Sequence, residues 1–373
     1  MPPPPPPGPP PPPPPPPVSS SSTPVVNASG GKAIQDLIAE KQAMVEAITP
    51  VRPKTPPPRE PDKLVDVHFD SLSCVQLFNK LQFGSQLLVL DCRDAQSFDK
   101  LHVRSAVNWD CVKHQSLLDL EEKVPRLFFR RQYHVILYDD GSSLESPSDR
   151  LKSAMDILVA DQRTQQTVRV LSGGLAAFSR SYPFLVKGTD EFNDAEYPSE
   201  IIDGFLFLGN WETANNRRVL RDLEITRVVN ATDSCDMPFK GDLEYLHCPL
   251  DDHAEADISA HFDDCLAFLC RAKKDSERVL IHCKMGMSRS PALVILWLMH
   301  KHNLSLREAT ELVRERRPYI NPNPGFLLQL GRREVELFGE TTIRFPSTDN
   351  ITMATPYEWR QPDGSWVTRV VIR

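Results

Sequence analysis

The chain has 373 residues, and its 50 acidic side chains outnumber 43 basic ones to give a formal net charge of −7 at pH 7. This length suits two domains with separate cores, plus tails. The acidic balance excludes a broad basic face for nucleic acid or an anionic membrane, so any anion must be recognised by a single loop. The apolar run Pro291–Met299 is too short to span a membrane, and a proline run stands where a secretory signal would lie. We therefore expect a cytoplasmic protein, with the nucleus as a second location.

Residues 1–63 begin with an almost continuous proline run and cannot bury a core, so we expect a disordered tail. A polyproline II helix in this tail suits profilin, SH3 or WW domains as partners. Within residues 32–49, apolar side chains recur at helical spacing, which predicts a short amphipathic helix that packs on a domain or, alternatively, binds a partner. These side chains are Ile34, Leu37, Ile38, Val45 and Ile48.

Residues 64–190 alternate between strand and helix patterns. The predicted strands are 87–93, 133–140 and 168–174, with a helix at 148–162. Strands that are separated by helices run parallel, so we expect an α/β domain built on a parallel sheet. A polar stretch around 187–200 then predicts a domain boundary.

Residues 197–340 show a second α/β pattern, so a second domain is expected there. Its predicted strands are 204–210, 225–232, 243–249 and 278–283. Its predicted helices are 260–274, 291–302, 306–317 and 325–337, of which Pro291 is expected to start the second. The remaining residues, 341–373, contain two β-rich runs around Pro362–Gly364, which predict a hairpin whose partner the pattern does not indicate.

The eight cysteines lack the spacing of a zinc site or a disulfide framework, but one stands in an unusual pattern. The stretch HCKMGMSRS, residues 282–290, joins the predicted strand 278–283 to the helix that follows. A thiolate nucleophile needs positive potential around its sulfur, and Cys283 has Arg289 six residues away. Taken alone, each residue has a purely structural interpretation. Together, they favour a loop that holds a phosphate group against the sulfur.

Each residue of this stretch has an expected role in holding the anion. The guanidinium of Arg289 binds two phosphate oxygens, the hydroxyl of Ser290 donates to the thiolate, and His282 holds the loop through hydrogen bonds. Backbone N–H groups form the cradle, with a glycine where a side chain would obstruct it. The cradle residues are Lys284, Met285, Gly286, Met287 and Ser288.

This loop resembles the signature loop of the protein tyrosine phosphatase superfamily. The domain around it is similar to the compact dual-specificity branch, through GFLFLGN, VVNAT and NPNPGFLLQL. The resemblance implies hydrolysis of phosphotyrosine and phosphoserine or phosphothreonine in proteins, through a phosphocysteine at Cys283 and without metal or organic cofactor. A phosphoprotein-binding adaptor, or a lipid or RNA phosphatase on the same fold, are the alternatives.

The branch also has an acid that protonates the leaving oxygen, and CPLDDHAEADISAHF resembles its loop. The register of PLDDH selects Asp252, with Asp251 as the alternative. Both aspartates have a structural interpretation too, as a solvated turn or a helix cap, which Asp257 fits equally well.

The first domain resembles a rhodanese-like domain through residues 87–109 and 168–186. Active rhodaneses carry a cysteine in the loop after the strand that corresponds to 133–140, and this chain has none there, so we expect an inactive domain. The two-domain order resembles MAP kinase phosphatases, whose first domain docks the kinase through arginines and apolar residues. Here the corresponding segment is acidic, with arginines only at its end, at Arg126, Arg130 and Arg131. The domain order makes a MAP kinase one candidate partner, but an acidic docking groove would be repelled by this acidic segment, so we expect no such docking. An actin-regulatory protein is another candidate, because HCKMG and SRS also resemble the slingshot phosphatases.

Overall fold

The computed structural model describes residues 67–83, 87–113, 133–161, 167–188 and 194–369. They belong to one compact unit, Leu64–Arg373. The predicted proline-rich tail and the helix at 32–49 lie outside the described residues. In the part of the chain that is described, no helix is long and apolar enough to cross a bilayer.

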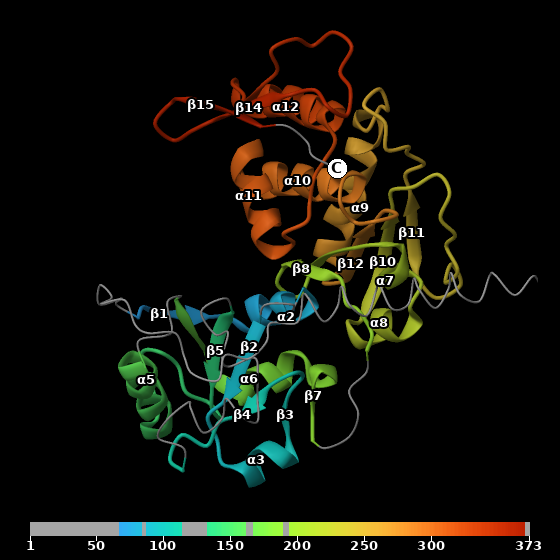
Figure 1. Cartoon of the computed structure of the whole chain (residues 1–373). Coiled ribbons are helices and arrows are strands. Elements are labelled where there is room, and N and C mark those ends of the chain that lie inside the picture. Colours follow the sequence, from blue (N-terminus) through green and yellow to red (C-terminus); the bar gives the residue numbers. More distant parts are fainter. Residues whose placement is uncertain (1–66, 84–86, 114–132, 162–166, 189–193, 370–373) are drawn as a thin grey trace, which may run out of the picture. The chain divides into compact units, whose positions relative to one another are not determined.

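The first domain is built on a five-stranded parallel sheet in the order β1-β6-β5-β2-β4 (Figure 1). The strands of this sheet and the helices beside them are β1 (Phe69–Leu72), α2 (Cys74–Gln82), β2 (Leu87–Asp91), α3 (Ala95–Lys100), β4 (Val107–Asn108), β5 (His134–Tyr138), α5 (Asp149–Asp161), β6 (Val168–Leu171) and α6 (Gly174–Ser181). The short strands β3 (His102–Val103) and β7 (Val186–Lys187) pair separately. The predicted α/β class is confirmed.

The second domain is built on a mixed sheet in the order β11-β10-β12-β9-β8, in which only the edge strand β8 runs antiparallel to its neighbour among the described pairs. Its strands are β8 (Ser199–Ile202), β9 (Leu206–Gly209), β10 (Ile225–Asn230), β11 (Glu244–His247) and β12 (Arg278–His282). Its helices are α7 (Trp211–Ala214), α8 (Arg217–Asp222), α9 (Phe262–Lys274), α10 (Arg289–His302), α11 (Leu306–Arg316) and α12 (Pro324–Phe338).

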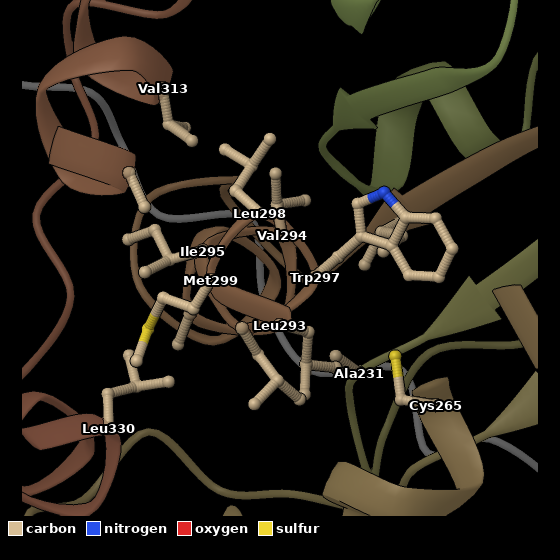
Figure 2. Packing of buried hydrophobic residues seen from close by; sticks show 14 of the residues in the cluster. Ala231, Cys265, Leu293, Val294, Ile295, Trp297, Leu298, Met299, Val313 and Leu330 are labelled. Atoms are coloured by element: carbon tan, nitrogen blue, oxygen red, sulfur yellow. The ribbon is translucent and has the colours of Figure 1, made fainter. Parts of the chain in front are cut away.

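Helix α10 lies at the centre of the core of the second domain. Every residue from Arg289 to Met299 is buried. Figure 2 shows its apolar side chains radiating towards Val313 of α11, Leu330 of α12 and Cys265 of α9. Since burying one leucine or isoleucine side chain stabilises a fold by about 1.5–3 kcal/mol, this helix is fixed firmly. Its N-terminus, and the loop that precedes it, are held with it.

Helix α10 begins at Arg289, so the prediction that Pro291 starts it is wrong by two residues. Pro291 occupies the third helical position. The first four N–H groups of a helix have no acceptor within the helix, so a proline is tolerated there. The earlier start places Arg289 and Ser290 on the rigid first turn of the helix.

The predicted C-terminal strands, β14 (Tyr357–Arg360) and β15 (Trp366–Arg369), pair antiparallel. Strand β13 (Ile343–Arg344) is the partner that the sequence did not indicate. Tyr357 and Trp359 pack on the core of the second domain. The buried carboxylate of Glu334 in α12 also accepts hydrogen bonds from Thr342 N at 2.7 Å and from Leu306 N at 2.7 Å. The tail is therefore anchored to helices α11 and α12.

Candidate active site

Cys283 follows strand β12 and opens a loop that ends at the first turn of helix α10. Its side chain is 2% exposed. Two donors reach its sulfur, the backbone N–H of Gly286 at 3.2 Å and the hydroxyl of Ser290 at 3.1 Å. N–H and O–H donors of this kind form stronger hydrogen bonds to an anion than to a neutral acceptor. The residues predicted as nucleophile and hydroxyl donor are thus in contact.

The backbone of the loop is tightly constrained at Gly286, whose φ is +69°. A Cβ atom there would lie 2.6 Å from the carbonyl oxygen of Gly209 and 2.7 Å from Nη2 of Arg317. Glycine is therefore required both by the left-handed conformation and by the lack of space. This result agrees with the sequence argument, which predicted a glycine where a side chain would obstruct the cradle.

Two backbone N–H groups from other segments of the domain bind carbonyl oxygens of the loop. Trp211 N donates to Lys284 O at 3.2 Å, and Asn321 N donates to Met287 O at 2.6 Å. In a trans peptide the C=O points away from the N–H of the following residue. The N–H groups that follow these two carbonyls, including that of Ser288, are consequently turned to the inner side of the loop. This orientation suits an anion.

Arg289 is the first residue of helix α10 and is 7% exposed. Its Nη1 donates to the carbonyl oxygen of Leu250 at 2.9 Å, which fixes the guanidinium beside the loop. Its Nε is buried and has no hydrogen-bond partner among the described residues. Because a buried donor without an acceptor is costly, an oxyanion in the loop would satisfy it.

His282 is the last residue of strand β12 and directly precedes Cys283. Its side chain is 1% exposed, and its Nδ1 finds no hydrogen-bond partner in the described part of the chain. Burial lowers the pKa of His282 to about 4, and the nearby Arg289 acts in the same direction, while the backbone of Cys283 opposes them. The imidazole is therefore neutral near pH 7, and the hydrogen bonds through which His282 is expected to hold the loop stay a prediction.

Asp252 reaches the loop from the segment after strand β11. Its Oδ1 accepts a hydrogen bond from Ser288 Oγ at 2.6 Å and another from Asn323 Nδ2 at 2.9 Å. Asp252 is half-buried, whereas the adjacent Asp251 is exposed. Of the two candidate acids, the geometry brings Asp252 to the loop.

Asn323 is a site residue that the sequence argument missed. It is fully buried and is the N-cap of helix α12, where its Oδ1 accepts from Phe326 N at 3.0 Å. Its backbone N–H donates to Ser288 Oγ at 3.1 Å, so one residue binds both the loop and Asp252. The signal was present, because an asparagine before a proline is typical of a helix start.

Comparisons with known proteins agree with this geometry. Residues 206–335 match the family model for the dual specificity phosphatase catalytic domain, and residues 75–181 match that for the rhodanese-like domain. Both matches lie inside the predicted domains, whose outer limits stay predictions. A probable rhodanese domain-containing dual specificity protein phosphatase of Dictyostelium discoideum is 35% identical over 69% of this chain and 68% of its own length.

Two vertebrate proteins are also similar to this chain. Dual specificity protein phosphatase 4 of Gallus gallus is 30% identical over 66% of this chain and 76% of its own length. Dual specificity protein phosphatase 1 of Homo sapiens is 31% identical over 66% of this chain and 78% of its own length. The chain belongs to the dual specificity phosphatase family. As a member, it is a cysteine-based protein phosphatase.

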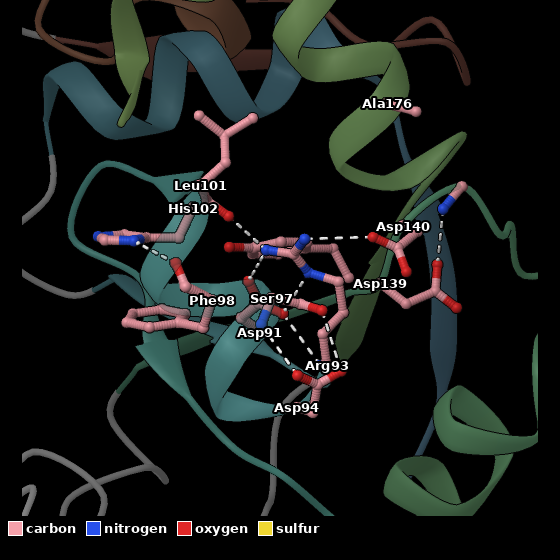
Figure 3. A network of polar contacts seen from close by, with 12 residues as sticks. Asp91, Arg93, Asp94, Ser97, Phe98, Leu101, His102, Asp139, Asp140 and Ala176 are labelled. Atoms are coloured by element: carbon pink, nitrogen blue, oxygen red, sulfur yellow. Dashed lines mark hydrogen bonds and ion pairs between the residues drawn. The ribbon is translucent and has the colours of Figure 1, made fainter. Parts of the chain in front are cut away.

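In the rhodanese-like domain of this phosphatase, the loop after strand β5 has no cysteine. In place of a cysteine, the carboxylate of Asp139 accepts hydrogen bonds from Ser142 N at 2.8 Å and Ser148 Oγ at 2.5 Å. Next to it, the buried Arg93 forms an ion pair with Asp91 at 2.7 Å and another with Asp140 at 3.2 Å (Figure 3). Arg93 thus balances two of the carboxylates at this end of the sheet, and neutral donors satisfy Asp139.

Cys92 follows strand β2 of the rhodanese-like domain and is fully buried. Burial raises the pKa of its thiol well above the ordinary value, and the neighbouring Cys111 and Asp91 act in the same direction. A buried thiol that is held neutral is a poor nucleophile. This environment supports a structural role for Cys92.

Proposed function

We propose that this phosphatase uses Cys283 as its nucleophile towards phosphomonoesters in proteins. The thiolate attacks phosphorus, so an S–P bond forms while the bond between phosphorus and the leaving oxygen breaks. Asp252 gives its proton to that oxygen. Water then attacks the phosphocysteine, Asp252 takes a proton from the water, and the thiolate leaves with the hydroxyl of Ser290 as its hydrogen-bond donor. Inorganic phosphate and the dephosphorylated protein are the products.

The transferring group carries negative charge that the loop must balance throughout. We assign this role to the inward N–H groups of the loop and to Arg289, whose buried Nε lacks a partner among the described residues. Such fixed donors stabilise the transition state without reorganisation. Neither step requires a metal ion, since the acid, the nucleophile and the positive charge are all side chains.

The strongest support for this proposal is the set of hydrogen bonds that brings Cys283 and Asp252 to the same loop. The sulfur of Cys283 accepts hydrogen bonds from Gly286 and Ser290, while Asp252 is bound to Ser288 of the same loop. The nucleophile and the acid are thereby both hydrogen-bonded to the same short segment, residues 283–290. A loop that only bound phosphoproteins would not need a reactive sulfur or a nearby acid.

The direct test replaces the sulfur alone. Cys283→Ser is expected to abolish hydrolysis of an aryl phosphate while retaining inorganic phosphate binding, because the N–H groups and Arg289 remain. Hydrolysis is followed by released aryl alcohol, and phosphate binding by calorimetry. Turnover by the variant close to that of the unchanged enzyme would refute the cysteine mechanism. A phosphoprotein-binding adaptor predicts the opposite pattern, with no hydrolysis by the unchanged chain.

We propose phosphotyrosine and phosphoserine or phosphothreonine in proteins as substrates, rather than lipid or RNA phosphates. The cradle carries a single lysine, Lys284, which gives little support for a highly charged substrate. Parallel assays with the three phosphopeptides, a phosphoinositide and a 5′-phosphorylated RNA separate these classes. Faster turnover of either non-protein substrate would overturn this assignment.

We propose that the rhodanese-like domain binds no MAP kinase through Arg126, Arg130 and Arg131, which lie outside the described residues. The segment before them, LLDLEEK, is acidic, and an acidic docking groove would repel it. In a titration with purified MAP kinase, we expect no tight binding, and Arg130→Ala with Arg131→Ala should change nothing. Tight binding that the double variant loses would show the reverse. An actin-regulatory substrate and proline-tail partners stay predictions, as does the cytoplasmic location.

A further inference from the structure

Arg317 follows helix α11 and is 4% exposed, yet it takes no part in the chemistry above. Its Nε donates to the carbonyl oxygen of Gly286 at 2.9 Å, and its Nη2 donates to that of Met285 at 3.5 Å. Its Nη1 lies 3.4 Å from Ser199 Oγ. A buried guanidinium thus directs its donors mainly at the outer side of the catalytic loop.

These two hydrogen bonds determine the direction of the peptide units they hold. Because each C=O points away from the following N–H, holding Met285 O and Gly286 O outwards turns the N–H groups of Gly286 and Met287 inwards. The first of these indeed ends 3.2 Å from the sulfur of Cys283. The carbonyls before and after them, Lys284 O and Met287 O, accept hydrogen bonds from Trp211 N and Asn321 N. Four consecutive peptide units therefore share one orientation.

The position of Arg317 is costly for a cation. Burial lowers its pKa, which the carboxylate of Glu196 and the sulfur of Cys283 oppose. A buried charge is tolerated when its donors are satisfied and an opposite charge lies near. The loop carbonyls supply the first condition, and negative charge on the sulfur or on a bound phosphate contributes to the second.

We propose that Arg317 is a positioning residue of the catalytic loop. It orients two of the N–H groups that bind the transferring phosphoryl group, and it does not itself touch the substrate. Arg289 differs from it, because Arg289 contacts the phosphate from the inner side. This inference rests on the proposed function, since the orientation matters for turnover only if the loop binds phosphate.

The test compares Arg317→Met and Arg317→Lys with the unchanged full chain. Arg317→Met removes both hydrogen bonds, and we expect inorganic phosphate to bind about tenfold to one-hundredfold more weakly, as for the loss of one charge-assisted hydrogen bond. The kcat for an aryl phosphate should fall too. Arg317→Lys keeps the charge but not the fork that spans two carbonyls, so its rescue should be partial.

Arg316→Met serves as the matched control. Arg316 is the preceding residue, and its Nη1 lies 3.9 Å from Oδ1 of Asp203 instead of contacting the loop. It should leave phosphate affinity and kcat unchanged. Full rescue by Arg317→Lys would show that charge alone matters, and unchanged phosphate affinity in both Arg317 variants would exclude any role in orientation. Thermal unfolding checks that the variants are folded. If Arg317→Met does not fold, the phosphate affinity of Arg317→Lys tests the positioning role.

Failure of this inference is distinguishable from failure of the proposed function. Phosphate binding is measured on the Cys283→Ser background, where no turnover is required. If Cys283→Ser still hydrolyses substrate, the cysteine mechanism fails while the effect of Arg317 on phosphate binding stands on its own. If Cys283→Ser is inactive and Arg317→Met binds phosphate normally, only the positioning role is overturned.

Discussion

Asn323 provides a sharp prediction, because it performs two separable roles. Its Oδ1 caps helix α12 through Phe326 N, and its Nδ2 donates to Asp252 at 2.9 Å. Asn323→Ala removes both. Asn323→Ser keeps a good N-cap oxygen but loses the amide donor. The serine variant thus isolates the contact with the acid from the stability of the helix.

The magnitudes follow from the two contacts. Losing the cap costs about 1 kcal/mol, which lowers the Tm of a domain of this size by about 2–4 °C. A hydrogen bond to a carboxylate contributes about 1.5–3 kcal/mol, and since Ser288 still holds Asp252, we expect a loss near the lower end. The kcat for a phosphopeptide should then fall about tenfold in both variants. Only Asn323→Ala should also lower the Tm.

The assay uses two substrates that differ in their need for a proton. A phosphopeptide has a poor leaving oxygen, whereas a nitrophenyl phosphate has a good one and needs little help from the acid. Both Asn323 variants should slow the phosphopeptide several-fold more than the aryl ester. Equal losses on both substrates would refute the idea that Asn323 acts through Asp252. An unchanged kcat in Asn323→Ser would show that only the cap matters.

Three further predictions follow from the site and the first domain. Asp252→Asn should slow phosphopeptides far more than good aryl esters, and a larger effect from Asp251→Asn would reverse the assignment of the acid. Since burial lowers the pKa of His282 to about 4, the unfolded chain binds an additional proton between pH 6.5 and 4. The free energy of unfolding should therefore fall with decreasing pH in that window by up to about 1.4 kcal/mol per unit, and denaturant titrations of His282→Gln should show a flatter profile. The full chain should show no thiosulfate sulfurtransferase activity, because the loop 139–148 has no cysteine, and a persulfide on the buried Cys92 would contradict this.

The local patterns of the sequence predicted much of the fold and the centre of the site. The buried strands β2, β5, β10 and β12 were readable as apolar runs, and Cys283 and Arg289 stood in a motif whose spacing has a chemical reason. These features depend on neighbours in the chain. The pattern around helix α10 was equally clear, although its start was misplaced because a proline fits the third position as well as the first.

What the sequence missed depends on contacts between distant residues. Strand β1 has four residues and is defined by pairing with β6, almost one hundred residues later, and β13 has only two. The roles of Asn323 and Arg317 arise because the backbone N–H of Asn323 and the side chain of Arg317 contact a loop more than thirty residues earlier in the chain. A cap or a helix end has many uses, so the residue type alone does not identify the partner.

The most direct test of the central claim is capture of the covalent intermediate. With an aryl phosphate, Asp252→Asn should still form the phosphocysteine, because the leaving group needs no proton, but should hydrolyse it slowly without the carboxylate. Acid quenching followed by peptide mass spectrometry is expected to find phosphate on Cys283, together with a burst of aryl alcohol equal to the enzyme. Phosphate on another residue, or steady turnover with no labelled Cys283, would contradict the account.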